Sequence, residues 1–246
     1  MKKTNYLIRC CPVCGAKPPK DVTVSTVNRA EDGDLETLTQ SWNGFFKEKI
    51  IFSYARCGSC DLLYCPIFFT NNQLETLYGK MPPNMDEVPM AALISTQYGY
   101  FKLLKNSSPL RGGFVEIGPD IGLFTAHCVN EGAFSEYWLF EPNRAVKSKL
   151  RNVVKDHKAH VIHEMTDFTA IPDGAASVAV IIHVMDHLLD PVTTLLALKK
   201  KLASDARLLI VTHDESSLLR RLFDWRWPAF CLQHPQIYRK GTTKSL

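Results

Sequence analysis

A glycine-containing turn between two apolar runs constrains this chain more than any other feature. The apolar run 114–117 leads into Gly118 and Gly122, after which the pattern becomes helical, and a second apolar run, 137–140, ends in Glu141. This succession of strand, glycine turn, helix, strand and acid is typical of a nucleotide-binding α/β unit. Glycine lets a ligand approach the main chain where a Cβ would collide. An ionised carboxylate can accept both hydroxyl protons of a ribose.

The composition is that of an ordinary globular protein with a modest positive charge. The 246 residues include 29 Lys and Arg and 25 Asp and Glu, which gives a net charge of +4, and 46% of the residues are hydrophobic. This charge argues against a nucleic-acid-binding protein, and no apolar run reaches the length of a membrane span. The N-terminus has neither the apolar core nor the cleavage site of a secretion signal. We therefore expect a cytoplasmic protein that does not act at a membrane.

Four of the eight cysteines form two Cys-x-x-Cys pairs, which are Cys11 with Cys14 and Cys57 with Cys60. In a cytosolic chain this spacing indicates a metal site and not disulfides. Four thiolates give a closed tetrahedral site, so we expect a structural zinc ion. The alternative is four reduced core cysteines. Cys10 and Cys65 flank the pairs, either as substitute ligands or as ordinary neighbours.

The chain divides by pattern into three parts: a zinc-binding module (1–65), a helical connector (66–110) and an α/β domain (111–246). We expect a strand at Lys49–Tyr54, a helix capped by Asn71 or Asn72, and a helix over Met90–Leu104. From Gly113 onward strands and helices alternate, which predicts a mostly parallel, Rossmann-like sheet with flanking helices. The expected strands are Gly113–Ile117, Tyr137–Phe140, His160–His163, Val178–His183 and Arg207–Thr212. The expected helices are Gly122–Glu131, Asn143–Val154, Val192–Leu202, which Asp190-Pro191 would start, and Ser216–Phe223.

Several motifs in order identify a family for the α/β domain. Glu116-Ile-Gly118-Pro-Asp120-Ile-Gly122 follows an acid-x-Gly-x-Gly-x-Gly pattern with Asp120 in place of the middle glycine. Glu141 ends the second strand, and the run from His183 to Pro191 reads His-Val-Met-Asp-His-Leu-Leu-Asp-Pro. Residues 113–212 thereby resemble the class I S-adenosylmethionine (SAM)-dependent methyltransferases. The four-cysteine module is similar to that of the sugar C-methyltransferases and their relatives, and Arg56–Tyr64 resembles its second knuckle. Near the C-terminus, Gln233-His234-Pro235 resembles a further segment of the same proteins.

The resemblance implies a role for each motif residue in binding SAM. Gly118 and Gly122 would let the main chain approach the methionine part, Glu116 would lie near its ammonium group, and Glu141 would hold the ribose. Asp120 would line the pocket or cap the following helix. Asp167 or Glu164 would accept a hydrogen bond from the adenine amino group, and His183 is a further candidate contact. The apolar residues that would either wall the adenine or belong to the core are Ile121, Pro142 and Phe168.

Histidines are the candidates for catalysis. His213 follows the fifth strand, and ligands bind beyond the carboxyl ends of parallel strands, so it is a candidate general base. His234 is the second candidate, and either could instead be a solvated loop histidine. His183 and His187 are four residues apart, and a metal pair is an alternative for them that we rank well behind.

The C-terminal part weighs against a fully active enzyme. The family sheet has seven strands, but only 34 residues follow Thr212. We therefore expect either a truncated domain or one that has lost its last strands, with a sheet edge that an oligomer would cover. The predicted function is methyl transfer from SAM to a small molecule, such as a sugar or related metabolite. The alternatives are a non-catalytic cofactor-binding or interaction protein and, with less support, a nucleic-acid methyltransferase.

Overall fold

The computed structural model describes residues 5–42, 49–79 and 88–244 and contains two compact units. The first unit consists of Met1–Leu77, Met185–Thr193 and Thr212–Leu246, and the second of Tyr78–Val184 and Thr194–Val211. Each unit is thus built from segments that are separated in the sequence. The ranges predicted for a zinc module, a connector and a methyltransferase domain stay a prediction.

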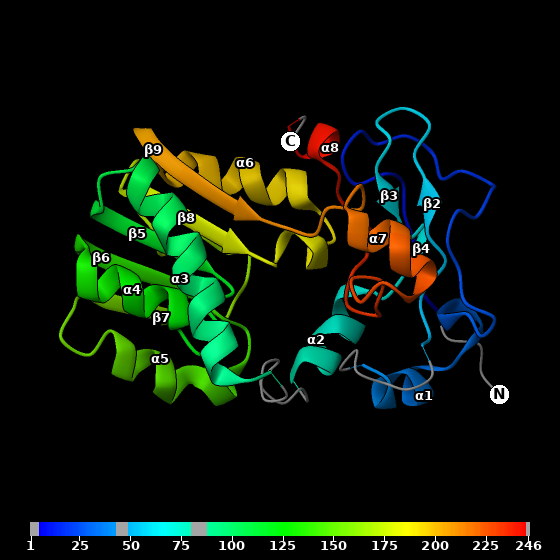
Figure 1. Cartoon of the computed structure of the whole chain (residues 1–246), viewed down its shortest axis with the longest axis horizontal. Helices are drawn as coiled ribbons and strands as arrows, with labels where there is room; N and C mark the ends of the chain where they lie inside the picture. Colours follow the sequence, from blue (N-terminus) through cyan, green and yellow to red (C-terminus); the bar gives the residue numbers. More distant parts are fainter. Residues whose placement is uncertain (1–4, 43–48, 80–87, 245–246) are drawn as a thin grey trace. The chain divides into compact units, whose positions relative to one another are not determined.

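A five-stranded sheet forms the centre of the second unit (Figure 1). Its strands are β5 (Arg111–Ile117), β6 (Ala133–Phe140), β7 (Ala159–Ile162), β8 (Ala176–Ile182) and β9 (Leu202–Val211). All of them are parallel, and their spatial order is β7-β6-β5-β8-β9. The order reverses at β5, so the carboxyl ends of β5 and its neighbours open a crevice for ligands. The predicted Rossmann-like α/β fold is confirmed.

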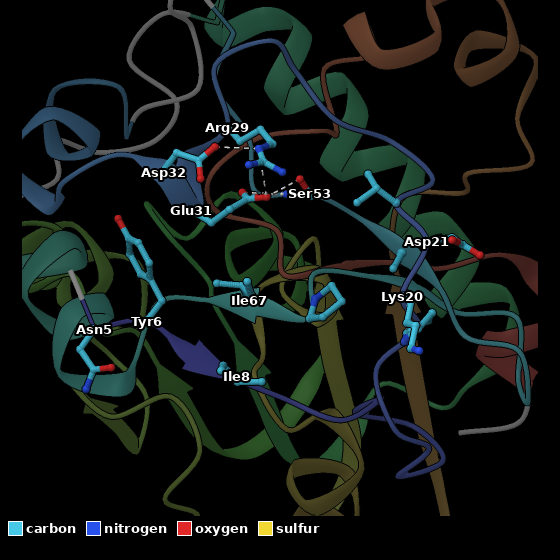
Figure 2. A pocket seen from close by; sticks show the side chains of 14 residues that line it. Asn5, Tyr6, Ile8, Lys20, Asp21, Arg29, Glu31, Asp32, Ser53 and Ile67 are labelled. Atoms are coloured by element: carbon cyan, nitrogen blue, oxygen red, sulfur yellow. Dashed lines mark hydrogen bonds and ion pairs between the residues drawn. The ribbon is translucent and has the colours of Figure 1, made fainter. Parts of the chain in front are cut away.

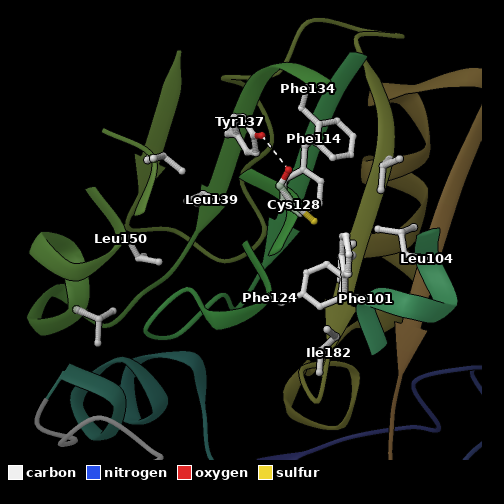
Figure 3. Packing of buried hydrophobic residues seen from close by; sticks show 14 residues of the cluster. Phe101, Leu104, Phe114, Phe124, Cys128, Phe134, Tyr137, Leu139, Leu150 and Ile182 are labelled. Atoms are coloured by element: carbon white, nitrogen blue, oxygen red, sulfur yellow. Dashed lines mark hydrogen bonds between the residues drawn. The ribbon is translucent and has the colours of Figure 1, made fainter. Parts of the chain in front are cut away.

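Helices cover this sheet because its strands carry apolar side chains on both faces. Three helices, α3 (Met90–Ser107), α4 (Leu123–Glu131) and α5 (Lys147–Val153), pack their apolar side chains against one face. Figure 3 shows Phe101 and Leu104 of α3 and Phe124 and Cys128 of α4 gathered around Phe114 of β5. Figure 1 shows α6 (Pro191–Lys201) on the other side of the sheet.

Short elements make up the first unit. Strand β1 (Leu7–Ile8) pairs with β4 (Ile67–Phe68), and a second sheet has the order β10-β3-β2. The strands of this second sheet are β2 (Ala55–Arg56), β3 (Leu63–Tyr64) and β10 (Gln236–Ile237). The helices are α1 (Leu35–Gln40), α2 (Asn71–Gly79), α7 (Leu218–Phe223) and α8 (Lys240–Lys244). In the described part of the chain, 3-10 turns lie at Ala30–Asp32, Met185–His187 and Asp224–Arg226 in this unit and at Arg144–Val146 in the second.

Some predicted boundaries are wrong. The segment Lys49–Tyr54 is not a strand, because Ile51 and Tyr54 form only isolated bridges. The predicted helix Asn143–Val154 begins with a 3-10 turn at Arg144–Val146 before α5. Neither Asn71 nor Asn72 caps α2. Thr70 does so, because its hydroxyl accepts the Gln73 N–H while the Gln73 side chain accepts the Thr70 N–H.

The start of α6 follows the prediction. The helix begins at Pro191, and Asp190 Oδ1 accepts the Thr193 N–H at 3.1 Å. Proline suits this position because the first N–H of a helix has no partner within it. In the part of the chain that the structure describes, no helix combines the length and apolarity needed to cross a bilayer.

Candidate functional site

The turn between β5 and α4 has three residues in left-handed main-chain conformation. Gly118, Asp120 and Gly122 have φ angles of 73°, 49° and 81°. Aspartate is one of the few residues with a side chain that adopts this conformation at small cost, which explains why Asp120 can replace the middle glycine. At Gly122, a Cβ would lie 2.9 Å from Leu150 Cδ2. Gly122 occupies the N-cap position of α4, and the role of Asp120, in the pocket or at the helix start, stays a prediction.

Gly118 is required by packing within the protein. A Cβ at this position would lie 2.3 Å from Val184 Cγ2, a distance that no side chain tolerates. The Gly118 N–H donates to Phe140 O at 2.9 Å and so ties the turn to the end of β6. Close approach to a ligand is therefore not needed to explain why a glycine stands here.

Glu141 lies at the end of β6 beside this turn. Its two carboxylate oxygens accept the N–H groups of Asp120 at 2.9 Å and Asn143 at 2.8 Å. The side chain is buried, and this burial raises the pKa of Glu141 to about 7, although the two N–H groups act in the opposite direction. Each oxygen keeps acceptor capacity after one hydrogen bond, so the carboxylate can still accept hydroxyl protons.

Glu116 lies one position before the end of β5 and is only 2% exposed. Burial raises its pKa to about 8, partly offset by a hydrogen bond from the Thr125 hydroxyl at 2.5 Å. The carboxyl group is therefore mostly protonated at neutral pH. A cationic group placed beside it would favour the ionised form, because opposite charges lower the pKa of a carboxyl group.

The other predicted cofactor contacts lie in separate loops of the second unit, before and after β8. Asp167 is exposed and accepts the Thr169 N–H, which lowers its pKa. Phe168 is buried and packs edge-to-face on Phe140, so it belongs to the core. His183 follows β8 with a φ of 52°, and its Nε2 lies 3.2 Å from the Tyr100 hydroxyl.

His213, in the first unit, forms a pair with an aspartate that sequence analysis did not single out. Asp186 is fully buried, and its Oδ2 accepts from His213 Nδ1 at 2.8 Å. The Thr212 hydroxyl donates to Asp186 Oδ1 at 2.5 Å. Burial opposes ionisation of Asp186, but His213 and the other donors lower its pKa on balance. A carboxylate that accepts from Nδ1 leaves Nε2 as the basic nitrogen of a neutral imidazole.

His234 is buried in the same unit and has a different protonation state. Burial opposes its charge, but Cys231 and the Asp186 carboxylate raise the pKa of His234 to about 9. Both ring nitrogens have acceptors that suit an imidazolium, namely Ala229 O at 2.7 Å from Nδ1 and His187 Nε2 at 3.2 Å from Nε2. At neutral pH His234 is therefore protonated and is a poor acceptor of a further proton.

The two Cys-x-x-Cys pairs come together in the first unit. All four sulfur atoms lie within 4.8 Å of one another, with 3.5 Å between Cys11 and Cys60 and 3.5 Å between Cys14 and Cys57. Burial, together with hydrogen bonds to the neighbouring cysteine sulfurs, raises the pKa of Cys60. A tetrahedral zinc site with bonds of about 2.3 Å to sulfur has nearly this spacing.

Figure 2 shows a pocket of about 700 Å³ in the first unit. Ile8 and Ile67 form its floor, since they are direct partners in the β1–β4 pair and therefore share one face. Three charged side chains on its wall, Arg29, Glu31 and Asp32, have partners within the lining. Arg29 Nε lies 2.7 Å from Asp32 Oδ2, and Glu31 accepts both the N–H and the hydroxyl of Ser53.

Comparison with known proteins gives one match to a family model. The model described as a methyltransferase domain matches residues 96–246, which is more than half of the chain. No curated protein matches the sequence.

Several solved structures of SAM-dependent methyltransferases are similar at low identity. The Leishmania major protein is 14% identical with a TM-score of 0.49, over 58% of this chain and 61% of its own. The Thermotoga maritima protein is 17% identical with a TM-score of 0.48, over 62% of this chain and 72% of its own. The chain thus spans about three fifths of the Leishmania protein, and such distant likeness does not bear on substrate.

Proposed function

The chain belongs to this methyltransferase-domain family and has its Rossmann-like fold, and we propose that it transfers the methyl group of SAM to a small molecule. The observation that carries the proposal is the buried carboxylate of Glu141 beside the left-handed turn 118–122. A sugar or related metabolite is the acceptor class we favour, on the resemblance of the four-cysteine module. A cytoplasmic location agrees with the reduced thiols of that module.

The residues of the second unit fit SAM in charge and in hydrogen-bonding capacity. When bound, SAM supplies an electrophilic methyl group on a sulfonium. Glu141 would hold the ribose hydroxyls with the acceptor capacity that Asp120 and Asn143 leave unused. Glu116 would give up its proton and balance the charge of the ammonium group. Asp167 and His183 remain candidate contacts for the adenine side and the crevice.

His213 is the better candidate for a general base. Asp186 positions the ring through Nδ1 and would stabilise the imidazolium formed when Nε2 takes a proton from the acceptor. His234 is protonated at neutral pH and would instead add positive charge near Asp186. Orientation of the acceptor contributes on the order of 7–11 kcal/mol to lowering the activation barrier. A general base contributes a rate increase of roughly 10²–10⁴-fold, which is the smaller effect.

We also propose that the four cysteines hold a structural zinc ion. The four sulfurs converge, and main-chain N–H groups of Val13 and Cys14 point at the Cys11 sulfur. Such N–H groups stabilise thiolates that carry more negative charge than one zinc ion neutralises. A closed site with four protein ligands has no open position for substrate, so this metal would not take part in the chemistry.

The test is calorimetric titration of the purified chain with SAM and with its demethylated product. We expect saturable binding that Glu141→Ala weakens about 100-fold or more while the thermal unfolding profile persists, because two buried N–H groups and the ribose lose their acceptor. Glu131→Ala, which removes an exposed glutamate of the same unit, is the matched control. Unchanged affinity in Glu141→Ala would remove this residue from the site. Binding without turnover on any acceptor would favour the non-catalytic alternative.

A further inference from the structure

A second pocket of the first unit has a volume of about 780 Å³. It is lined by the first residues of two helices and by one arginine. Its walls are the segment from Leu7 to Gly15, the first residues of α2 with Thr70, and the segment from Leu189 to Thr193 that begins α6. None of the SAM-binding candidates lines it. The pocket therefore needs an explanation of its own.

Arg9 lines this pocket and is a buried cation without a carboxylate partner. It is 8% exposed, and its Nη2 donates to Leu189 O and Gln236 Oε1, both at 3.0 Å. Its Nη1 has no acceptor among the described residues. A buried cation needs a counter-charge, and either the proposed metal–thiolate cluster that contains Cys11 or an anion in the pocket would supply it.

The other buried charges of the first unit are paired, which sets Arg9 apart. Glu215 binds the guanidinium groups of Arg56 and Arg239, and Asp186 binds His213. In the pocket of Figure 2, Arg29 has Asp32 as its partner. Among the described residues, Arg9 is thus a buried arginine whose hydrogen bonds reach only uncharged acceptors.

The helix starts add partial positive charge and N–H donors. Helix α2 has nine residues and α6 has eleven, and both begin at the pocket. The N–H groups of Asn71, Asn72 and Val192 lie in the first turns of these helices, where they have no acceptor within the helix. Helix N-termini favour anions for this reason. One group opposes an anion: the carboxylate of Asp190 lines the pocket, where it already accepts the Thr193 N–H.

We propose that this pocket binds a small dianion of the phosphate type, with Arg9 as its counter-charge and the first N–H groups of α2 and α6 as donors. A tetrahedral anion suits donors that approach from separate segments, and Arg9 together with the two helix starts outweighs the single carboxylate of Asp190. The ligand class is a phosphate or a phosphorylated small molecule. This site is independent of methyl transfer and of SAM.

The experiment is a titration of the 246-residue chain, purified in the presence of zinc, with inorganic phosphate, followed by amide NMR shifts at constant ionic strength. Saturable shifts are expected at Asn71, Asn72 and Val192, while acetate at equal ionic strength produces at least about tenfold weaker binding because it carries one charge. Asn72→Asp should weaken phosphate binding about tenfold or more by placing a carboxylate at the α2 start. Asn28→Asp makes the same change at an exposed position of the same unit and should have no effect.

Arg9→Met tests the counter-charge directly, and retained folding is checked by the amide spectrum of the first unit. Loss of phosphate binding in a folded Arg9→Met variant supports the proposal. If that variant does not fold, Asn72→Asp alone decides. Absence of saturable shifts in the wild type, or equal binding by wild type and Asn72→Asp, would overturn the proposal and leave the metal–thiolate cluster as the counter-charge of Arg9.

Discussion

The two units hold their functional residues in different ways. In the second unit, the turn 118–122 and Glu141 lie on neighbouring strands of one parallel sheet and are about twenty residues apart in the chain. In the first unit, Arg9 forms a hydrogen bond with Gln236, which is 227 residues away in the sequence. His213 forms one with Asp186, 27 residues away. A site formed by successive elements leaves a motif in the sequence, whereas a site formed by distant segments leaves only isolated polar residues.

The largest expected effect is that the first unit, but not the second, needs bound metal to stay folded. Removing zinc with a chelator, or changing Cys57→Ser, should unfold the first unit, because binding of structural zinc contributes about 10–16 kcal/mol. The five-stranded sheet should persist, since its core is a continuous apolar cluster. Hydrogen exchange read by mass spectrometry would show lost protection in β1–β4 and retained protection in β5–β9.

Cys10→Ser is the control for this experiment, since Cys10 is exposed and adjacent to the cluster but is not one of its four members. It should leave zinc content and protection unchanged. A wild-type chain that is purified without zinc yet has a protected first unit would contradict the metal proposal and support reduced core cysteines.

The next effect concerns the histidine–aspartate pair of the first unit. Asp186→Asn should reduce methyl transfer by roughly 10²–10⁴-fold, because His213 loses the partner that fixes its tautomer. The readout that separates positioning from mere stability is the ¹⁵N spectrum of the His213 ring. The wild type should show an Nδ1–H tautomer, and the variant should lose it.

Asp214→Asn is the matched control, since Asp214 is exposed beside His213 and an asparagine can still accept the Ser216 N–H. Its rate and its ring spectrum should equal those of the wild type. An unchanged His213 tautomer in Asp186→Asn would show that the pair does not set the protonation pattern.

Much of the second unit could be predicted, because local pattern and tertiary structure agree there. The strands around Gly118 and Glu141, and the start of α6 at Pro191, follow from apolar runs, glycines and a proline. The capping error had a readable signal, since Thr70-Asn-Asn-Gln73 has the spacing of a capping box. The segment Lys49–Tyr54 alternates like a strand, but its residues Ile51 and Tyr54 form only isolated bridges. Whether such a segment becomes a strand depends on its pairing partners and not only on its own pattern.

The first unit shows what sequence patterns omit. Asp186 stood inside a quoted motif, but its significance depends on His213, which only the fold brings to it. The buried state of Arg9 depends on contacts with Leu189 and Gln236. Conversely, Gly118 reads as a ligand-facing glycine, but its left-handed main chain and the close Val184 side chain already require a glycine. The type of a residue indicates which chemistry its side chain can perform. It does not show which neighbouring group that side chain contacts in the folded protein.

A smaller effect tests the buried acid of the second unit. Folded Glu116 has a pKa of about 8, well above that of an exposed glutamate, so the folded state binds more protons between about pH 4.5 and 8. Stability should therefore fall as the pH rises through that range. Glu116→Gln, which can still accept from Thr125, should raise the melting temperature at pH 9 and change it little at pH 4.5. A pH-independent difference would show that Glu116 is not protonated in the folded state.

The smallest effect is the pH dependence of SAM affinity. Glu141 has a pKa of about 7 in the free protein, and hydroxyl protons donated to its carboxylate would lower that value in the complex. Binding then requires loss of a proton below about pH 7, so Glu141 alone should make the affinity fall by up to about tenfold per pH unit in acid. Glu116 acts in the same direction, so the slope should become shallower, but not vanish, in Glu116→Gln. Calorimetry in buffers of different ionisation enthalpy would count the protons released, and a count of zero at pH 6 would mean that neither carboxyl group faces the ligand, leaving the second unit with a motif but without the site it predicts.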